Sequence, residues 1–436
     1  QKQKKKTGVD KAEDALPYRH QGIAGRVTYA YYDRYFIEGN FGYNGSENFS
    51  PGHRFGFFPS VAAGWLVSNE KFWEPISHVI DMLKIKGSYG EVGNDQIGGN
   101  RRFIYNATVI DSGSYDFGKT AHTEKGLRVG DWANPNVGWE RAKKMNAGVE
   151  ISFFNALKIQ ADYFSEKREG IFLERASLPL YIGVSTKPYV NVGKMKNHGF
   201  DTSLEYNQRV GQVRLSGKAN FTYAHNTIID NDQPDWKYPY LNRRGQMLWQ
   251  QYGLVAAGLF ESQADIDSWP TQTFGEVKPG DIKYIDINGD GKIDTNDEKP
   301  IGWAAVPEIV YGFGLSAAWK GLDCSVFFQG AGHVTLQQSG SAIQAFSARN
   351  MMESGVYEDI YYNHWSEDNP NPNAKYPRLS IGSNKNNFRN STFWQKDMSY
   401  LRLKTVEIGY NFPSKWIDPI HISGLRIYLS GVNLLT

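Results

Sequence analysis

Alternation of apolar and polar residues with a period of two is the dominant signal in the sequence, and it is the pattern of a β-strand that has one face in an apolar environment. The same alternation runs through residues 34–44, 144–153, 157–163 and 212–223. In the last of these, one face carries Val213, Leu215, Gly217, Ala219, Phe221 and Tyr223, and the other carries Gln212, Arg214, Ser216, Lys218, Asn220 and Thr222. The pattern therefore predicts long strands with one apolar and one polar face.

We expect about twelve such strands: residues 23–32, 34–44, 55–66, 83–91, 141–153, 157–165, 197–207, 212–224, 308–319, 322–331, 398–411 and 423–433. Most are longer than the roughly 5–6 residues usual in soluble sheets, and their length suits a tilted strand that crosses a bilayer. Their polar faces carry charges at mid-strand, namely Lys86, Glu150, Glu205 and Lys218. Such charges would be costly in a dry sandwich core but not in a water-filled lumen.

The connections between these strands alternate between short and long. Short ones lie near Asp33, Asn155, Arg209 and Lys320 and at residues 67–82 and 412–422, and long ones are residues 45–54, 92–140, 166–196, 225–307 and 332–397. This alternation is typical of a barrel with small periplasmic turns and large external loops. Greek-key sandwiches have no such rule, and we find no blade repeat of about 40–45 residues. The predicted fold class is all-β, an antiparallel up-and-down transmembrane β-barrel with long external loops.

Composition agrees with this fold and excludes several functions. The 436 residues include 12 Trp, 26 Tyr, 24 Phe and 45 Gly, which favours strands and turns. The 48 Lys and Arg residues are nearly balanced by 46 Asp and Glu, so the composition gives no support for a basic surface that binds nucleic acid. Cys324 is the single cysteine, so a disulfide scaffold is excluded. Its alternation with Leu322 and Val326 predicts that it faces lipid and is inert.

A calcium-binding pattern lies within the long connection 225–307. Oxygen-bearing side chains fall at positions 1, 3, 5, 9 and 12 of a loop with glycine at position 6, and position 7 contributes its backbone carbonyl. The predicted ligand set for Ca²⁺ is Asp286, Asn288, Asp290, Lys292 (through its carbonyl), Asp294 and Asp297. Position 12 is Asp rather than the usual Glu, and no helix pair flanks the loop. A loop of Asx turns that only retains the pattern is the alternative, and any bound ion is expected to be structural.

Aromatic residues in the long connections are the candidates for substrate binding, because they can stack on sugar rings or contact a covering protein. These candidates are Trp132, Trp236, Tyr238, Tyr240, Trp249 and Trp365. The alternative for each is packing within the loops or a place in the interfacial aromatic belt.

Signals for catalysis are weak. Neither an HExxH nor a Gly-x-Ser-x-Gly motif occurs. Glu358 and Asp359 form an acidic pair in a polar loop, which is poor support for a glycosidase. Lys2–Lys6 could bind anionic lipid or lipopolysaccharide, but a solvated segment is the simpler interpretation. The sequence predicts that this chain is not an enzyme.

Several stretches, in order along nearly the whole chain, match the motifs of one known family. They are Gly25–Tyr35, Gly56–Trp65, Leu83–Asn94, Asn191–Phe200, Gly280–Gly302, Tyr400–Tyr410 and Gly431–Leu434. Together they resemble the SusC/RagA-type TonB-dependent outer-membrane transporters of Bacteroidota. The resemblance implies a share of a 22-stranded barrel that encloses an N-terminal plug, with a SusD-like lipoprotein as a lid. It also implies import of oligosaccharides or peptides across the outer membrane, energised by TonB–ExbB–ExbD. Nothing in the sequence matches the N-terminal extension, the plug, the TonB box, the first barrel strands or the final aromatic-ended strand, so we expect residues 1–436 to be the C-terminal barrel portion.

A secreted, soluble, calcium-stabilised carbohydrate-binding β-protein remains the alternative. It would explain the loop aromatics and the loop at Asp286, but it leaves the apolar strand faces, such as Met145 to Phe153, without a facing layer. The sequence does not distinguish an oligosaccharide from a peptide substrate.

Overall fold

The computed structural model describes residues 16–99, 101–119, 122–184, 186–347 and 355–435. The chain divides into two compact units, which are described separately below. The first comprises the residues up to Pro234 together with Gly312–Phe327 and Thr405–Gly431, and the second comprises Asp235–Tyr311, Phe328–Lys404 and the last residues from Val432. No helix among the described residues is both long and apolar enough to cross a membrane.

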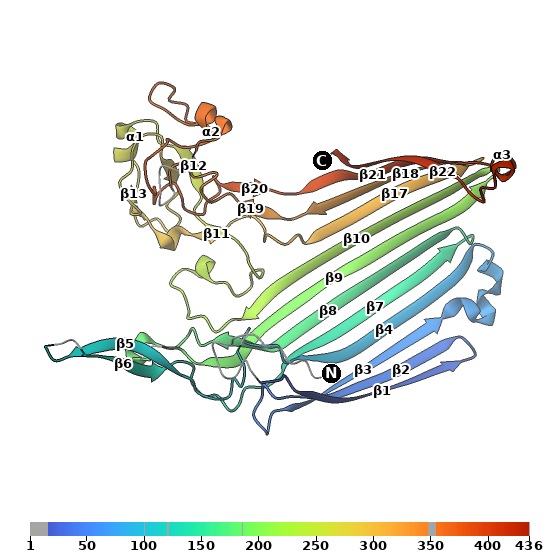
Figure 1. Cartoon of the computed structure of the whole chain (residues 1–436), viewed down its shortest axis with the longest axis horizontal. Coiled ribbons are helices and arrows are strands. Elements are labelled where there is room, and N and C mark those ends of the chain that lie inside the picture. The colour runs from blue at the N-terminus through green and yellow to red at the C-terminus, as the bar shows by residue number, and fades with distance from the viewer. Residues whose placement is uncertain (1–15, 100, 120–121, 185, 348–354, 436) are drawn as a thin grey trace. The chain divides into compact units, whose positions relative to one another are not determined.

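Twelve strands form one antiparallel sheet, in the order β1-β2-β3-β4-β7-β8-β9-β10-β17-β18-β21-β22 (Figure 1). Their bounds are β1 His20–Tyr31, β2 Tyr35–Ser46, β3 Phe55–Leu66, β4 Ile80–Asn94, β7 Glu140–Phe153, β8 Leu157–Glu174, β9 Tyr189–Val210, β10 Val213–Asp230, β17 Ile309–Trp319, β18 Leu322–Gly332, β21 Tyr400–Asn411 and β22 Arg426–Leu435. Each of the twelve strands predicted from the alternation is present, so the all-β prediction is confirmed. The sheet is open in this chain, with β1 and β22 at its two ends.

The predicted strand ends are wrong where apolar alternation stops before the hydrogen-bonded ladder does. β8 continues to Glu174 and β9 begins at Tyr189, so most of the predicted connection 166–196 is strand. The outward residues next to the predicted strand ends are charged, namely Lys167, Glu169, Lys194 and Lys196. Apolar alternation therefore stops there, although the backbone pairing continues. The predicted connection 92–140 likewise contains a hairpin, β5 Val109–Phe117 with β6 His122–Val129.

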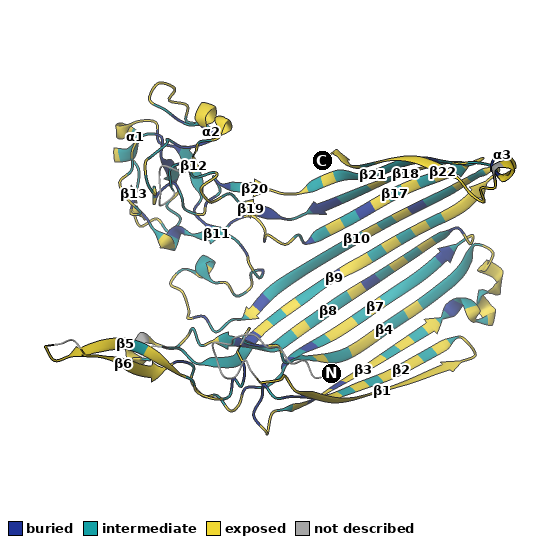
Figure 2. Ribbon diagram, in the orientation of Figure 1, coloured by how far each residue is buried: buried dark blue, intermediate teal, exposed yellow. Residues whose placement is uncertain are grey.

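Cross-strand register separates the two faces of the sheet. Strands β4, β7, β8, β9 and β10 align Leu83, Ile151, Ile159, Leu204 and Ala219 in one row, and Ile85, Val149, Ala161, Thr202 and Phe221 in the next. The residues between them in sequence point to the opposite face, because side chains alternate along a strand. Figure 2 shows the resulting stripes of exposed and partly buried residues along the strands. One face is therefore apolar over several consecutive rows.

The opposite face is polar, and its charges are paired across strands. The Lys86 ammonium lies 2.9 Å from Glu150 and 3.2 Å from Asp162. Lys218 and Glu205, which are register partners, lie 3.9 Å apart. All four residues named in the sequence prediction therefore share the polar face, as expected for a wet lumen rather than a dry core.

Short helical turns occupy some of the connections in the first unit. They are η2 Val67–Asn69, η3 Lys71–Ile76, η4 Leu180–Ile182, α3 Ser414–Ile417 and η8 Asp418–Ile420. A small cluster of Phe49, Ile97, Ile104, Val137 and Phe172 packs the connections of this unit together. The helical turn predicted within residues 70–80 is present as η3.

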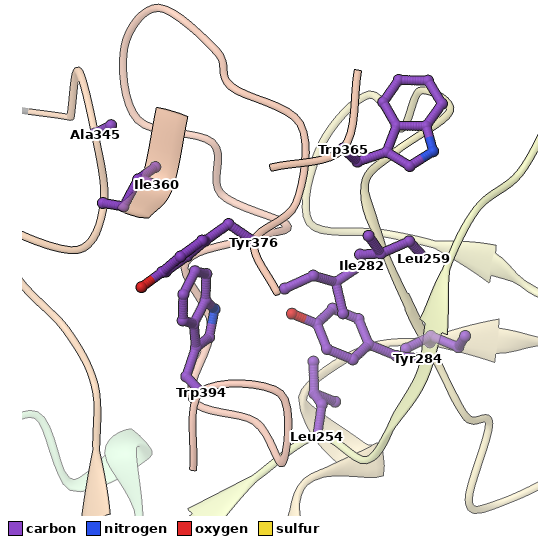
Figure 3. Close-up of a cluster of buried hydrophobic side chains, with 10 residues drawn as sticks. Leu254, Leu259, Ile282, Tyr284, Ala345, Ile360, Trp365, Tyr376 and Trp394 are labelled. Atoms are coloured by element: carbon purple, nitrogen blue, oxygen red, sulfur yellow. The ribbon is translucent and has the colours of Figure 1, made fainter. Parts of the chain in front are cut away.

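The second unit is built from short elements around its own core. These are η5 Pro239–Leu241, β11 Tyr252–Gly253, β12 Ala256–Leu259, α1 Gln263–Asp267, β13 Thr271–Gln272, β14 Ile282–Tyr284, β15 Lys292–Ile293, η6 Thr295–Asp297, β16 Lys299–Pro300, β19 Thr335–Gln337, α2 Glu358–Asn363 and β20 Gln395–Asp397. Tyr284 lies fully buried among Leu254 and Ile282 (Figure 3). Its hydroxyl donates to the carbonyl of Asn386 at 2.8 Å, and burial raises the pKa of the phenol. The long connections 225–307 and 332–397 therefore pack against each other around a common core.

A buried polar network ties these two connections to each other. Asp281 is fully buried, and its carboxylate lies 2.8 Å from the Arg378 guanidinium. The same carboxylate accepts from the side-chain amides of Asn384 at 3.1 Å and Asn387 at 2.7 Å, and from the backbone amide of Lys278 at 2.8 Å. A buried carboxylate is tolerated only when paired and hydrogen-bonded in this way.

We expect Asp281→Ala to destabilise the second unit by about 3 kcal/mol, because it leaves the Arg378 charge and the side-chain amides of Asn384 and Asn387 without their acceptor. Hydrogen exchange of the detergent-purified protein should show lost protection in residues 281–284 and 384–387 and unchanged protection in β7 and β8. Asp235→Asn is the control, since Asp235 pairs with Arg244 at the surface, 94% exposed. Equal loss of protection in both variants would contradict the role of the network.

Candidate functional site

The predicted calcium loop begins two residues after β14, contains β15 and ends with η6, and glycine supplies its turns. Gly289 and Gly291 have φ values of 72° and 79°, in the left-handed region that favours glycine. The Asp286 carboxylate accepts the backbone amides of Gly289 at 2.7 Å and Gly291 at 2.8 Å. Asn288 and Asp290 accept the amides of Asp290 and Lys292 at 2.9 Å and 3.0 Å. The first half of the loop is thus a succession of Asx turns.

Asp297 closes the loop from its last position. It is fully buried, and its carboxylate accepts the amides of Ile287 at 2.8 Å, Asn288 at 3.3 Å and Asp294 at 2.8 Å. Asp294 and Asp297 also form a reciprocal capping box around η6. The carboxylate at position 12 therefore joins the two ends of the loop through three backbone donors.

The donor chemistry of the loop suits calcium, because Asp and Asn oxygens are the ligands that this ion takes. As placed, the carboxylates are organised by backbone amides, and within the described ranges no three Asp, Glu, His or Cys side chains converge as metal ligands. A carboxylate oxygen that accepts one amide keeps a second lone pair. The Asx-turn alternative accounts for the geometry, and the calcium prediction rests on the residue types.

Two of the predicted substrate aromatics lie against this loop. Tyr238 and Tyr240 stack with ring centroids 5.6 Å apart, and the Tyr240 hydroxyl donates to the Asn296 carbonyl at 2.6 Å. Burial and the nearby Asp297 carboxylate raise the pKa of Tyr240. The Lys237 ammonium lies 4.8 Å from the centre of the Tyr238 ring. The loop therefore supports an aromatic pair beside a cation.

The other predicted aromatics have different surroundings. Trp236 and Trp249 are 51% and 66% exposed, so their ring faces are accessible. Trp365 is 5% exposed and belongs to the core of the second unit, which is the packing alternative stated for it. Trp132 lies in the first unit, where its indole nitrogen donates to the Thr186 carbonyl at 2.7 Å. The structure thus brings Tyr238 and Tyr240 together and assigns Trp365 to packing.

Sequence reasoning missed a cavity of about 290 Å³ in the first unit, which Trp132 helps to line. The Arg101 guanidinium lies 4.3 Å from the centre of the Tyr189 ring and donates to its hydroxyl at 3.2 Å. The Asp131 carboxylate lies 3.5 Å from Arg101 on another side. Arg101 and Tyr189 are 88 positions apart in the chain, so a local sequence pattern cannot predict this cavity.

The acidic pair Glu358 and Asp359 has none of the features of a catalytic pair. The Asp359 carboxylate accepts from the Lys375 ammonium at 2.6 Å and from the Tyr376 hydroxyl at 2.7 Å. Hydrogen bonding to Lys375, then to Tyr376, lowers the pKa of Asp359. A glycosidase acid needs the opposite shift, so this residue holds α2 in place instead.

Comparison with known proteins assigns the chain to a family. The TonB-dependent receptor-like β-barrel family matches residues 18–434. The chain belongs to this family. TonB-dependent receptors of this kind are outer-membrane proteins, so the predicted location and barrel class are confirmed. The soluble secreted alternative is therefore excluded.

Relatives of this TonB-dependent receptor barrel include proteins of two bacteria. The chain is 29% identical to TonB-dependent receptor P3 of Formosa agariphila over 95% of its own length and 40% of that protein. It is 24% identical to TonB-dependent receptor SusC of Bacteroides thetaiotaomicron over 94% of its length and 39% of that protein. It thus spans about 40% of the length of these relatives, which are named as receptors and not as enzymes.

Solved structures agree on the fold. The RagAB peptide transporter matches 96% of this chain and 44% of its own chain, with a TM-score of 0.73 and 23% sequence identity. The predicted resemblance to SusC/RagA-type transporters is confirmed by this match and by the match to SusC.

We expect Asp297→Ala to loosen the candidate loop in the absence of calcium, because it leaves three backbone amides without an acceptor. The cost should be about 2 kcal/mol, as for buried donors that lose their partner. Hydrogen exchange in a chelator-containing buffer should show faster exchange at Ile287, Asn288 and Asp294. Asp290→Ala removes an exposed carboxylate from the same loop and should change these rates little. Unchanged rates in Asp297→Ala would refute its closing role.

Proposed function

We propose that this chain supplies barrel strands and external loops to a longer TonB-dependent importer that takes up oligosaccharides or peptides. The observation that carries the proposal is the sheet itself, whose two faces have opposite chemistry. The apolar rows suit contact with lipid, and the paired charges around Lys86, Glu150 and Asp162 suit a hydrated interior. A family of outer-membrane receptors with this fold transports solutes rather than transforming them.

The long connections supply the binding surfaces in this proposal. The stacked pair Tyr238 and Tyr240, with Trp236 and Trp249 accessible in the same unit, suits flat apolar ligand faces such as sugar rings. The cavity beside Arg101 and Tyr189 offers a guanidinium that Asp131 pairs at 3.5 Å, together with an aromatic ring, and this mixture of polar and aromatic groups suits a peptide. Both substrate classes therefore have support from different residues, and Trp365 is left out because it is buried.

The partners follow from the same proposal. A SusD-like lipoprotein would cover the external loops, and TonB–ExbB–ExbD would energise uptake through a plug outside the stretch that these residues match. RagAB is described as a peptide transporter, and SusC as a TonB-dependent receptor, which supports a transport role without fixing the substrate. The long connection 225–307, with the loop 286–297 as its brace, would be one of the lid-facing loops.

We expect a strain that lacks the protein to lose growth on one class of polymer, either glycan or protein hydrolysate, and to regain it with the intact gene. Complementation with Trp236→Ala and Tyr238→Ala together should slow uptake of a labelled oligosaccharide at least about fivefold if the ligand is a glycan. Arg101→Ala should slow uptake of a labelled peptide if the ligand is a peptide. Affinity purification from solubilised outer membranes should recover a lipoprotein partner.

Uptake that persists in a strain without TonB, or a soluble protein recovered from the culture medium, would contradict the proposal. Trp319→Ala is the control, since this exposed residue at the opposite end of β17 belongs to neither loop surface.

We also propose that the loop 286–297 binds Ca²⁺ as a structural ion through Asp286, Asn288, Asp290, the carbonyl of Lys292, Asp294 and Asp297. The residue types and the two left-handed glycines support it. A bound ion would rigidify the platform on which Tyr238 and Tyr240 stack.

Removal of calcium by a chelator should lower the melting temperature of the second unit, and titration calorimetry should show heat on its return. At 100 times the dissociation constant the ion would add about 2.7 kcal/mol. Asp290→Ala should abolish the calcium response and leave the calcium-free stability unchanged. No heat of binding, together with identical melting with and without chelator, would show that the loop is held by its amide bonds alone.

A further inference from the structure

Three lysines lie directly opposite one another on the apolar face of the sheet. Lys143 of β7 pairs in register with Lys167 of β8, which pairs with Lys196 of β9. Like charges at directly opposed positions, with Cβ atoms about 5 Å apart, destabilise a sheet. Adjacent strands are about 4.8 Å apart, so the three side chains start within about 10 Å. Glu169 is the carboxylate that two of these ammonium groups share, so the row calls for further negative charge beyond that one side chain.

The lysine row sits just beyond the aromatic rows of the same face. The row below it contains Tyr89, Met145, Ser165, His198 and His225, and the next contains Gly87, Ala147, Tyr163, Phe200 and Tyr223. Aromatic residues gather at the level where the apolar band of a barrel meets the headgroups. The lysines therefore start at headgroup level, with their aliphatic stems against the apolar band.

The height of the row supports the same placement. Phe153, at the turn end of β7, and Lys143 are ten positions apart on one outward face. At about 3.3 Å per residue and a tilt of about 40°, this spacing is about 25 Å along the membrane normal, the height of the apolar band of a barrel. The long connections 95–139 and 175–188 leave the sheet at the lysine end, which is the external side.

The surrounding charges leave a surplus of cations on this face. Glu169 is shared between Lys167 at 2.8 Å and Lys143 at 3.5 Å, and Glu91 is paired with Arg141 at 3.1 Å. Lys194 and Lys196 are exposed, and neither has an ion-pair partner among the described residues. The Asp230 side chain accepts the backbone amide of Asp232 at 3.0 Å. The unneutralised charge is thus concentrated where β8 and β9 meet.

The opposite face at the same level shows no such surplus. There, Lys144 lies 3.2 Å from Glu166, and Arg168 lies 2.7 Å from Glu140 and 2.8 Å from Glu166. Two cations face two carboxylates, so the lumen face is balanced within the chain. At this level of the described sheet, the surplus of cations is therefore on the outward face.

We propose that Lys143, Lys167 and Lys196 form a binding site for the phosphorylated headgroup of an outer-leaflet glycolipid. Three ammonium groups around one phosphate would replace the mutual repulsion of the row with charge-assisted hydrogen bonds. The acyl chains of the lipid would lie along the apolar rows that continue below. The inference rests on the membrane location of the family and on the register of the strands, and it is independent of the imported substrate.

The test uses the intact protein purified from outer membranes and stripped of lipid. Native mass spectrometry would measure binding of a diphosphorylated lipid A and of the same lipid without phosphates. We expect the phosphorylated lipid to bind at least tenfold more tightly, and 0.5 M salt to weaken it severalfold, as for charge pairing near the surface. Equal binding of the two lipids would overturn the proposal.

Matched variants locate the site. The triple variant Lys143→Gln, Lys167→Gln and Lys196→Gln should reduce binding of the phosphorylated lipid about tenfold. Lys144→Gln, Lys158→Gln and Lys218→Gln remove the same charge from the lumen face of neighbouring strands and should reduce it less than twofold. Equal losses in the two triple variants would overturn the proposal.

Two further measurements test whether misfolding of the triple variant, or binding of free phosphate in place of the lipid, explains the result. The single variant Lys196→Gln breaks no ion pair and should still weaken binding of the phosphorylated lipid about threefold. It replaces the triple variant in this test if the triple variant does not insert into the outer membrane. Inorganic phosphate at millimolar concentration should neither raise the melting temperature nor displace the lipid. Displacement by inorganic phosphate would identify a free-anion site and contradict a headgroup site.

Discussion

The requirement that every backbone amide and carbonyl be hydrogen-bonded within the protein governs a structure that faces lipid. A continuous antiparallel ladder meets this requirement for β1–β4 and β7–β10 with few register shifts. One of those shifts, between Glu169 and Ile171, lies beyond the apolar band. Since the ladder fixes the register, it also fixes which side chains share a face. The apolar rows, the lumen charges and the lysine row are all consequences of that alignment.

Charge on each face then follows the medium that the face contacts. Lys86 can keep its charge on the lumen face because Glu150 and Asp162 lie within 3.2 Å and its side chain is only partly buried. In the second unit a charged side chain is stabilised in another way. Asp281 is fully buried, so all of its hydrogen bonds must come from protein donors. The external loops are thereby built around a polar network as well as an apolar core, and the stacked Tyr238 and Tyr240 are held on that rigid base.

Much of the sheet could be predicted from the sequence because alternation is a local signal with a physical cause at every second residue. The predicted bounds of β3 are the observed ones. The predicted β8 and β9 are too short, because Lys167 and Lys196 interrupt the apolar alternation although the backbone hydrogen bonds continue past them. The residues of the candidate site are harder to predict from the sequence. Tyr238 and Tyr240 were found by residue type, and Trp365 was indistinguishable from them until its burial was known. Arg101 and Tyr189 could not be found, because their contact depends on the folding of two connections and not on local spacing.

The central claim is that alternate residues of one strand face lipid and a wet lumen. It is tested most directly by single cysteines at Ala161 and Gln160 of β8, in a Cys324→Ala background in native outer membranes. A membrane-impermeant maleimide should label the cysteine at 160 and not that at 161, and a lipid-borne nitroxide should quench a fluorophore attached at 161 far more strongly than one at 160. Equal labelling and equal quenching at the two positions would contradict the account.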